Sequence, residues 1–387
     1  MELTRIDDVA ARQSIDSMRV YREFVRVRRE LNALAGSLFW KKVGEYEYLA
    51  HKVGAGTKYK GARSESTEAQ FKEYVAKKAK LKSRYESLKA TVEASQRMNR
   101  AVHAGAVPAE VVDVLTQIEQ RGLTERSLVV GTPALYAYSQ SSGVSLKAVK
   151  LDGKALQVLE SAPKCLRVLI HRPEKAESYA LSELRRALSK FATIQVGRQK
   201  KSSEWVDLLI HFSPRKSKAM GRKTGSTSQV GMVSPDRKEG TSKAMSKAGA
   251  DRVHACEMLK LWRVESEGSW QASEDRRLEQ LLERTPGFEQ VVVGKTGKMA
   301  VMRTVDPRLF VSLERALHAV AASVKADEES ELPVRLVEQM IDTSMVVTKL
   351  DEASTAALSE EVQNIVRDAV ANGDSAGGIT AVPESQP

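Results

Sequence analysis

The amino-acid sequence predicts an α+β protein, and three observations lead to this fold class. Long amphipathic segments near both ends repeat their apolar residues at helical spacing. Short apolar runs, typical of buried strands, lie within residues 125–212 and again at 288–303. A glycine turn joins a strand pattern to a helix pattern in the segment Ser127–Tyr138. These features favour one sheet with helical regions before and after it.

The N-terminal region, residues 1–124, is expected to be mostly helical. Residues 14–35 predict an amphipathic helix that Gly36 ends. A long helix is expected from about Ser64 to His103 with Thr67 as its N-cap, and another from Pro108 to Gly122.

The segment between the first two helices predicts a short hairpin. Aromatic residues alternate with lysines on both sides of Gly44, and Gly54 and Gly56 predict the next turn. This pattern fits a hairpin packed onto the helices, and it also fits a surface on which nucleic-acid bases stack. The residues concerned are Phe39, Trp40, Tyr46 and Tyr48 with Lys41, Lys42 and Lys52.

A strand-turn-helix junction follows at residue 127. Leu128–Val130 predict the end of a buried strand, Gly131 and Thr132 a tight turn, and Pro133 the first position of a helix that ends near Gly143. A helix N-terminus presents free backbone N–H groups and the positive end of its dipole, and Thr132 adds a hydroxyl. The junction therefore predicts a phosphate-binding turn, although a capped helix in an ordinary α/β domain has the same pattern.

The rest of the chain divides at a change of composition. Residues 213–250 hold nine Lys or Arg and two acids with almost no large apolar side chain, which predicts a disordered basic insertion that acts as a linker or as an arm contacting nucleic acid. Within the core, 125–212, strands are expected at 145–150, 155–159, 164–170, 193–196 and 204–212 and a helix at 178–190. Within residues 251–371 we expect helices at 251–263, 273–284, 307–325, 332–349 and 355–371 and a strand pair at 291–302. Residues 372–387 are expected to form a disordered tail.

Composition narrows the class of protein. The chain has 387 residues, enough for two or three domains, and a formal net charge of +11, which favours polyanionic partners only where the charge is clustered. No secretory signal or membrane-spanning run is seen, and two cysteines cannot form a disulfide framework. We therefore expect a cytoplasmic protein without a membrane partner.

The motifs, taken in order, resemble the bacterial proteins identified as nucleotidyltransferase-like, a family of the polymerase-β-like superfamily. The clearest match is Val130-Gly-Thr-Pro-Ala-Leu-Tyr-Ala-Tyr138 with Gly143-Val144, where the family typically has Gly-Thr-Asn-Ala-Leu-Tyr-Ala-Tyr-Glu. The resemblance covers roughly residues 20–350, interrupted by the basic insertion. The other matching segments are Arg28-Arg29, Gly36–Lys41, Tyr48-Leu49, Gly61–Glu68, Lys78, Arg84, Val206–Leu209 and Val305–Phe310.

The resemblance implies a polymerase-β-like nucleotidyltransferase core with a small mixed sheet, flanked by N-terminal and C-terminal helical regions. In such cores the glycine turn receives the phosphates of the nucleotide. An Asp-x-Asp pair on the next main strand and a third carboxylate on a neighbouring strand hold divalent metal ions. Mg²⁺ suits these sites because it prefers hard oxygen ligands and neutralises charge on the transferred phosphoryl group.

The sequence departs from this pattern at two of the three carboxylates. Cys165 and Arg167 occupy the Asp-x-Asp positions, and Asp207 alone remains as the third carboxylate. Arg167 pairs with Asp207, or receives a phosphate, or does neither. Asp152 and Glu160 are the candidate replacement acids, but both have the surroundings of loop residues.

We therefore expect a nucleotidyltransferase-like protein with a degenerate metal site and a nucleotide or phosphate pocket at Gly131 and Thr132. No cofactor is predicted except Mg²⁺ if the site is active, and whether the protein is an enzyme stays open. The alternative is a non-catalytic module that binds nucleic acid or a protein through its basic surface and the 213–250 insertion.

Three further patterns have structural explanations. Cys165 would need a base, His171 or His211, to act as a nucleophile, and a buried structural cysteine is expected instead. His254 and Cys256 lack a second ligand pair at zinc spacing. The segment Gly294–Gly297 lacks the spacing of a P-loop and predicts a hairpin turn.

Overall fold

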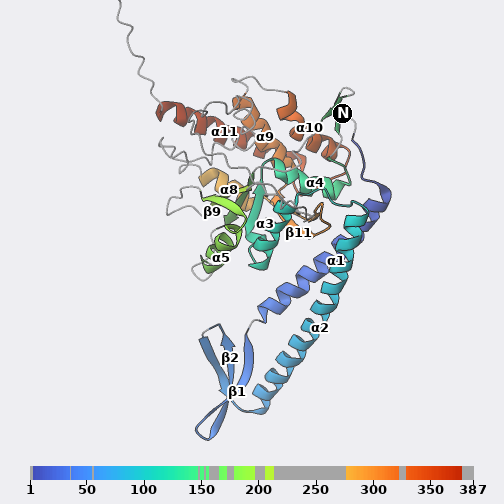
Figure 1. Ribbon diagram of the computed structural model, residues 1–387. Helices are drawn as coiled ribbons and strands as arrows, with labels where there is room; N and C mark the ends of the chain where they lie inside the picture. Colours follow the sequence, from blue (N-terminus) through green and yellow to red (C-terminus); the bar gives the residue numbers. More distant parts are fainter. Residues whose placement is uncertain are drawn as a thin grey trace, which may run out of the picture.

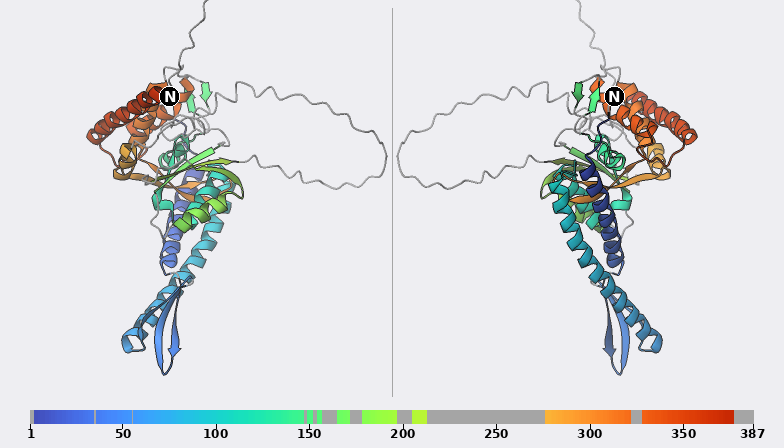
Figure 2. Two further views of the ribbon diagram at one scale, coloured as in Figure 1. Left: turned by 90° about the vertical axis from the view of Figure 1, so that its left-hand side faces the viewer. Right: turned by 90° about the vertical axis from the view of Figure 1, so that its right-hand side faces the viewer.

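The structure of the protein is a computed structural model (Figure 1). It describes residues 3–34, 36–54, 56–146, 149–151, 154–156, 165–171, 178–196, 205–212, 276–321 and 328–376. The body of the molecule contains a β-sheet with helices around it, and a long arm of two helices and a small sheet extends from the body (Figures 1 and 2). The predicted α+β class is confirmed.

The central sheet has six strands in the order β10-β11-β4-β7-β9-β8. β11 runs parallel to β4, and the other neighbouring pairs are antiparallel, so the sheet is mixed. The strands expected at 128–130, 164–170, 193–196 and 204–212 therefore share one sheet with those at 288–303. Their bounds are β4 Ser127–Val130, β7 Cys165–His171, β8 Ala192–Val196, β9 Trp205–Phe212, β10 Gly287–Val293 and β11 Met299–Val305. A separate pair, β5 Val149–Leu151 and β6 Lys154–Leu156, corresponds to the strands expected at 145–159.

The neighbouring strands β4, β7 and β9 are largely buried, because apolar residues lie on both of their faces. On β9, Val206, Leu208 and Ile210 are each at most 4% exposed, as the alternation in that strand predicts. The helices α3 (Ala109–Gln120), α4 (Leu135–Ser142) and α5 (Ser178–Leu188) contribute to the same apolar core. A sheet covered in this way holds the side chains at the ends of its strands in fixed positions.

The N-terminal region forms the arm. Helices α1 (Asp8–Ala33) and α2 (Glu65–Ala101) pack along each other, and the strands β1 (Ser37–Val43), β2 (Tyr46–Val53) and β3 (Gly56–Ala62) form an antiparallel sheet at the far end (Figures 1 and 2). The predicted hairpin β1–β2 is confirmed. The third strand was not predicted, because the segment from Gly56 to Ala62 lacks alternating apolar residues and is mostly exposed.

The N-terminal helices pack on β10 and β11 at one end and extend away from the body at the other (Figure 1). One detail of the arm differs from the sequence-based expectation. The N-cap of α2 is Ser64, and Thr67 is the third helical residue, whose hydroxyl accepts a hydrogen bond from the Ser64 backbone N–H at 2.8 Å. The two residues together make a capping box.

The base of the arm is fixed to the body by a buried carboxylate, Glu119 of α3. Its Oε2 accepts hydrogen bonds from the Tyr21 hydroxyl at 3.1 Å and from the Val301 backbone N–H at 3.3 Å, and it forms an ion pair with Arg28. The Glu119 side chain is only 1% exposed. Burial also raises the pKa of Tyr21 to about 12. Glu119 thus connects α1 to the edge of the central sheet.

The C-terminal helices lie above the sheet in Figure 1. They are α8 Arg276–Arg284, α9 Pro307–Ala321, α10 Glu328–Asp342 and α11 Glu352–Ala376. The helix predicted at 332–349 is therefore too long at its end, and Lys349 instead donates its backbone N–H to Asp306 at 2.8 Å. The helix α11 continues past residue 371, to Ala376.

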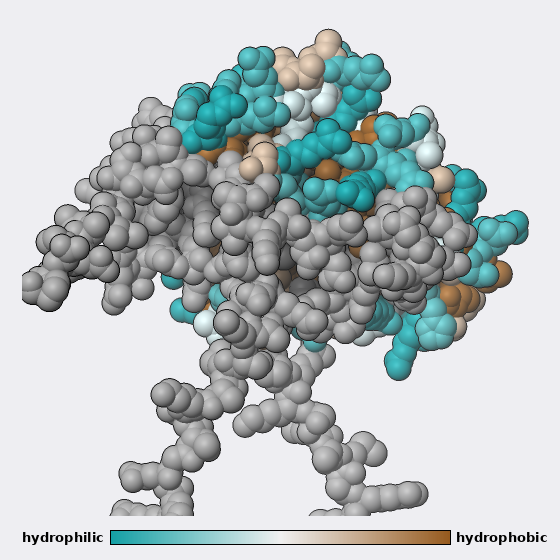
Figure 3. Space-filling view, turned by 90° about the horizontal axis from the view of Figure 1, so that it is seen from above, coloured by the Kyte–Doolittle hydropathy of each residue, from teal (hydrophilic) through white to brown (hydrophobic). Residues whose placement is uncertain are grey.

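Seen from above, the described surface is mainly hydrophilic, with small separate hydrophobic areas (Figure 3). Within the described ranges, no helix combines the length and the apolar character needed to cross a bilayer. The basic insertion at 213–250, the helix expected at 251–263, Asp152, Glu160, His254 and Cys256 lie outside the described residues.

Candidate functional site

The glycine turn has the strand-turn-helix geometry that the sequence predicts. Gly131 follows β4 with φ 78° and ψ −166°, a conformation that side chains other than glycine rarely adopt. A 3-10 turn at Thr132–Ala134 then leads into α4, so Pro133 lies before the α-helix and not at its first position. No side chain caps the backbone N–H groups at the start of either helix. The Ala134 N–H donates to the Gly131 carbonyl at 2.9 Å, the Leu135 N–H donates to the carbonyls of Thr132 and Pro133, and Pro133 has no N–H. The turn therefore offers a phosphate the Thr132 hydroxyl and the N-terminal end of the α4 dipole.

The register of the sheet brings the three predicted metal-ligand positions to one face beside this turn. Val130, the last residue of β4, is paired with Arg167 on β7. Leu169, two residues further along β7, is paired with Asp207 on β9. Side chains two residues apart in a strand lie on the same face, so Cys165, Arg167 and Asp207 share one face. The three side chains therefore lie close to the end of β4, beside the glycine turn.

Arg167 and Asp207 form a buried ion pair. The Nε of Arg167 donates to both carboxylate oxygens of Asp207, at 3.0 and 3.1 Å, and its Nη2 makes a further contact with Oδ2. The side chains are 11% and 10% exposed. Of the alternatives that the sequence left open for Arg167, pairing with Asp207 is therefore confirmed.

The residues at these positions do not fit a two-metal site. The resemblance implies three carboxylates, whereas this face offers a disulfide-bonded cysteine, a guanidinium and one carboxylate that the guanidinium already contacts. Within the described part of the chain, no three His, Cys, Asp or Glu side chains cluster in a way that could hold a metal ion. Cys165 lies in the sheet with 9% of its surface exposed, and its register partner is His211.

Two other candidates from the sequence, His171 and the segment Gly294–Gly297, make contacts that stabilise the fold. His171 contacts Glu283 through Nε2 at 3.4 Å and the ring of Trp205 at a centroid distance of 5.2 Å. The segment Gly294–Gly297 is the turn of the β10–β11 hairpin, as predicted, with a hydrogen bond from Gly297 N–H to Gly294 at 2.7 Å. By the alternation of β7, His171 lies on the same face as Arg167, but its ring is engaged with Glu283 and Trp205.

Comparison with protein-family models, with curated proteins and with solved structures found no match. The nucleotidyltransferase-like family therefore remains a proposal based on motifs.

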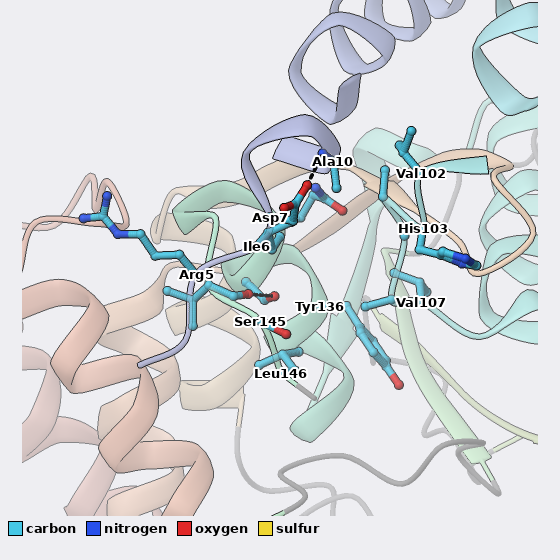
Figure 4. A pocket seen from close by; sticks show the side chains of 16 residues that line it. Arg5, Ile6, Asp7, Ala10, Val102, His103, Val107, Tyr136, Ser145 and Leu146 are labelled. Atoms are coloured by element: carbon cyan, nitrogen blue, oxygen red, sulfur yellow. Dashed lines mark hydrogen bonds between the residues drawn. The ribbon is translucent and has the colours of Figure 1, made fainter. Parts of the chain in front are cut away.

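A cavity of about 220 Å³ lies beside α4, where the N-terminal segment meets the loop between α2 and α3 (Figure 4). Arg5, Asp7, His103, Tyr136 and Gln140 are among its lining residues, and neither Gly131 nor Thr132 is. Most of its polar groups already serve the fold. Asp7 caps α1, and the amide of Gln140 contacts Ser14 at 2.6 Å and the Val293 N–H at 3.3 Å. Sequence reasoning missed this cavity because its walls come from three distant segments.

Proposed function

We propose that the protein is a nucleotidyltransferase-like protein that binds a nucleotide or phosphate group at Gly131 and Thr132 and does not perform metal-dependent nucleotidyl transfer. The observation that carries this proposal is the buried ion pair between Arg167 and Asp207 beside the glycine turn. It occupies the place where the family resemblance implies metal-binding carboxylates.

The electrostatics of that face oppose a divalent cation. A metal ion bound to Asp207 would displace the guanidinium of Arg167 or lie within a few ångströms of it. Two unit positive charges 4 Å apart repel by about 4 kcal/mol at an effective dielectric constant of 20, and a divalent ion doubles that figure. The guanidinium is already neutralised by Asp207, so it adds little attraction for an anion. The electrostatics of this face therefore argue against a metal ion, and the proposal of phosphate binding depends on the Thr132 hydroxyl and the N-terminal end of the α4 dipole.

Calorimetric titration with the four nucleoside triphosphates, with and without Mg²⁺, tests the binding part. We expect binding that does not require Mg²⁺ and that weakens in Thr132→Ala. The matched control is Thr343→Ala, at an exposed threonine on the C-terminal side of α10. Equal affinity of wild type, Thr132→Ala and Thr343→Ala would place any bound nucleotide elsewhere.

Incubation with labelled nucleoside triphosphates, Mg²⁺ or Mn²⁺ and RNA or protein acceptors tests the absence of transfer. Robust label transfer that is lost in Asp207→Ala would contradict the proposal. The combined substitution Cys165→Asp with Arg167→Asp would restore the carboxylates that the family resemblance implies. It is expected to create Mn²⁺ binding, measured by electron paramagnetic resonance, and no gain of binding would show that these positions are misassigned.

A further inference from the structure

Among the described residues, the positive charge is concentrated in the arm. Residues 37–100 contain 15 Lys or Arg and 7 Asp or Glu, a net charge of +8, and the 213–250 insertion, which lies outside the described residues, carries a further +7. This segment comprises the small sheet and α2, which extend from the body (Figures 1 and 2). A protruding element of this charge attracts polyanions.

One face of the small sheet packs on α2. The ring of Trp40 on β1 lies 5.8 Å from that of Phe71, and His51 on β2 lies 6.1 Å from Tyr74, both aromatic residues of α2. Trp40 is paired with Leu49, which has no exposed surface. These contacts give the sheet its apolar side.

The opposite face, which we call the open face, carries the remaining aromatic residues. Side chains alternate between the two faces of a strand, so the neighbours of Trp40 and His51 point away from α2. The register groups them on that face in cross-strand pairs. The residues of the open face are Phe39, Lys41, Tyr46, Tyr48, Lys52 and Tyr59.

Four side chains of the open face are exposed, those of Lys41, Tyr46, Lys52 and Tyr59, and those of Phe39 and Tyr48 are half-buried between them and the sheet. Tyr46 is 66% exposed and Tyr59 51%. The ring of Tyr48 lies 6.1 Å from that of Tyr59, and the Lys41 ammonium donates a hydrogen bond to the Tyr59 hydroxyl at 2.7 Å. Two exposed tyrosines beside the half-buried Tyr48 are not needed for the stability of a sheet whose other face is already packed on a helix.

We propose that the open face binds single-stranded nucleic acid, with unpaired bases stacked on Tyr46, Tyr48 and Tyr59 and phosphates held by the surrounding lysines. The charge argues for a polyanion, and the exposed aromatic rings argue for one with unstacked bases. A duplex keeps its base faces inside the stack and offers this surface only its phosphates. The site is separate from the glycine turn, and the proposal does not depend on nucleotide binding there.

Fluorescence anisotropy of the full chain with a labelled 15-nucleotide single strand tests the proposal. Two ligands control for charge: a duplex of the same length, and a single strand in which abasic residues replace the bases. We expect Tyr59→Ala to weaken binding of the single strand by about fivefold or more, and the abasic strand to bind more weakly by at least that factor. A single strand that binds no better than its abasic form would overturn the proposal.

Paired variants separate the arm from the rest of the basic surface. Lys41→Gln with Lys52→Gln removes two exposed charges from the open face, and Arg185→Gln with Lys190→Gln removes two exposed charges from the body. We expect the first pair to weaken binding and to reduce the slope of log affinity against log salt by about 1.4, and the second to change neither. Equal effects of the two pairs would show non-specific attraction. Circular dichroism of each variant checks that the fold is kept.

Discussion

Breaking the Arg167–Asp207 pair should destabilise the protein strongly, although removing the whole pair should not. Because the two side chains are only 11% and 10% exposed, each charge depends on the other for its solvation. Removing one partner of such a pair costs about 3–5 kcal/mol, whereas replacing both by apolar residues is close to neutral or stabilising. Arg167→Met and Asp207→Leu are therefore each expected to lower the free energy of unfolding by about 3–5 kcal/mol. The double substitution is expected to lie within about 1 kcal/mol of wild type or above it.

Urea denaturation followed by tryptophan fluorescence measures these values. Trp205 is a local probe, because it is 4% exposed and lies two residues before Asp207 on β9. The matched control is the exposed Arg277–Asp368 pair at 2.9 Å, with 46% and 51% of its side chains exposed. The same substitutions there should cost no more than about 1 kcal/mol each. Additive effects of Arg167→Met and Asp207→Leu, or single effects as small as those of the control, would refute the reasoning.

Three further predictions concern stability elsewhere in the fold. Burial raises the pKa of Glu314 from 4.5 to about 7, so the folded state holds the proton more tightly; the free energy of unfolding should fall by about 3 kcal/mol as the pH rises from below 4.5 to above 7. Glu314→Gln should remove this fall. Urea denaturation of the variant and of wild type at pH 4.5 and pH 8 tests this, and the prediction is wrong if the two proteins differ in free energy of unfolding by the same amount at both pH values. Gly297→Ala should cost about 2 kcal/mol or more in thermal or urea unfolding, because φ is +81° and a Cβ would lie 2.0 Å from a backbone oxygen of α2. The control is Gly44→Ala, where φ is +63° and no atom lies within 4 Å of the added Cβ. It should cost less than Gly297→Ala, because only the unfavourable backbone conformation contributes and there is no steric clash. Glu119→Ala should lower the free energy of unfolding by about 3–5 kcal/mol, because it leaves the buried guanidinium of Arg28 without its partner. The control is Glu125→Ala, at a 73% exposed carboxylate paired with Arg29, which should cost less than about 1 kcal/mol. Similar losses in the two variants would contradict the role of Glu119 as a buried anchor.

The sequence predicted the parts of the fold that depend on local patterns. The strands β4, β7 and β9 were predicted by continuous apolar runs, and their sharing of one sheet follows from the burial that such runs require. The contact between Arg167 and Asp207 was one of three alternatives, because charge complementarity suggested it while the register of β7 and β9 was unknown. A shift of that register by one residue would have moved the two side chains to opposite faces.

The features that the sequence did not predict depend on contacts between distant segments. Glu119 has the sequence of an ordinary surface acid on an amphipathic helix, and only the packing of α1 and β11 around it makes it a buried anchor. The direction of the arm is set at its base, by that anchor and by the apolar contacts of α1 with β10 and β11, and no local pattern encodes it. The strand β3 pairs through its backbone and carries mostly polar residues, so periodicity gave no signal for it.

The length of the arm also keeps the charges of the open face too far from the glycine turn for a direct electrostatic interaction between the two proposed binding sites. The helix α2 has 37 residues, which corresponds to a length of about 55 Å at 1.5 Å per residue. Exposed charges are screened over a Debye length of about 8 Å at physiological ionic strength, so the lysines of the small sheet cannot act directly on a phosphate at Gly131. The base of α2 is nevertheless held against the central sheet, because Asn99 donates to the Gly297 carbonyl at 3.2 Å and Gly297 leaves no room for a side chain beside Gln96. Communication between the two sites would therefore require either a ligand long enough to reach both or a movement of α2 as a rigid body. Substitutions on the open face and at the glycine turn can accordingly be interpreted independently.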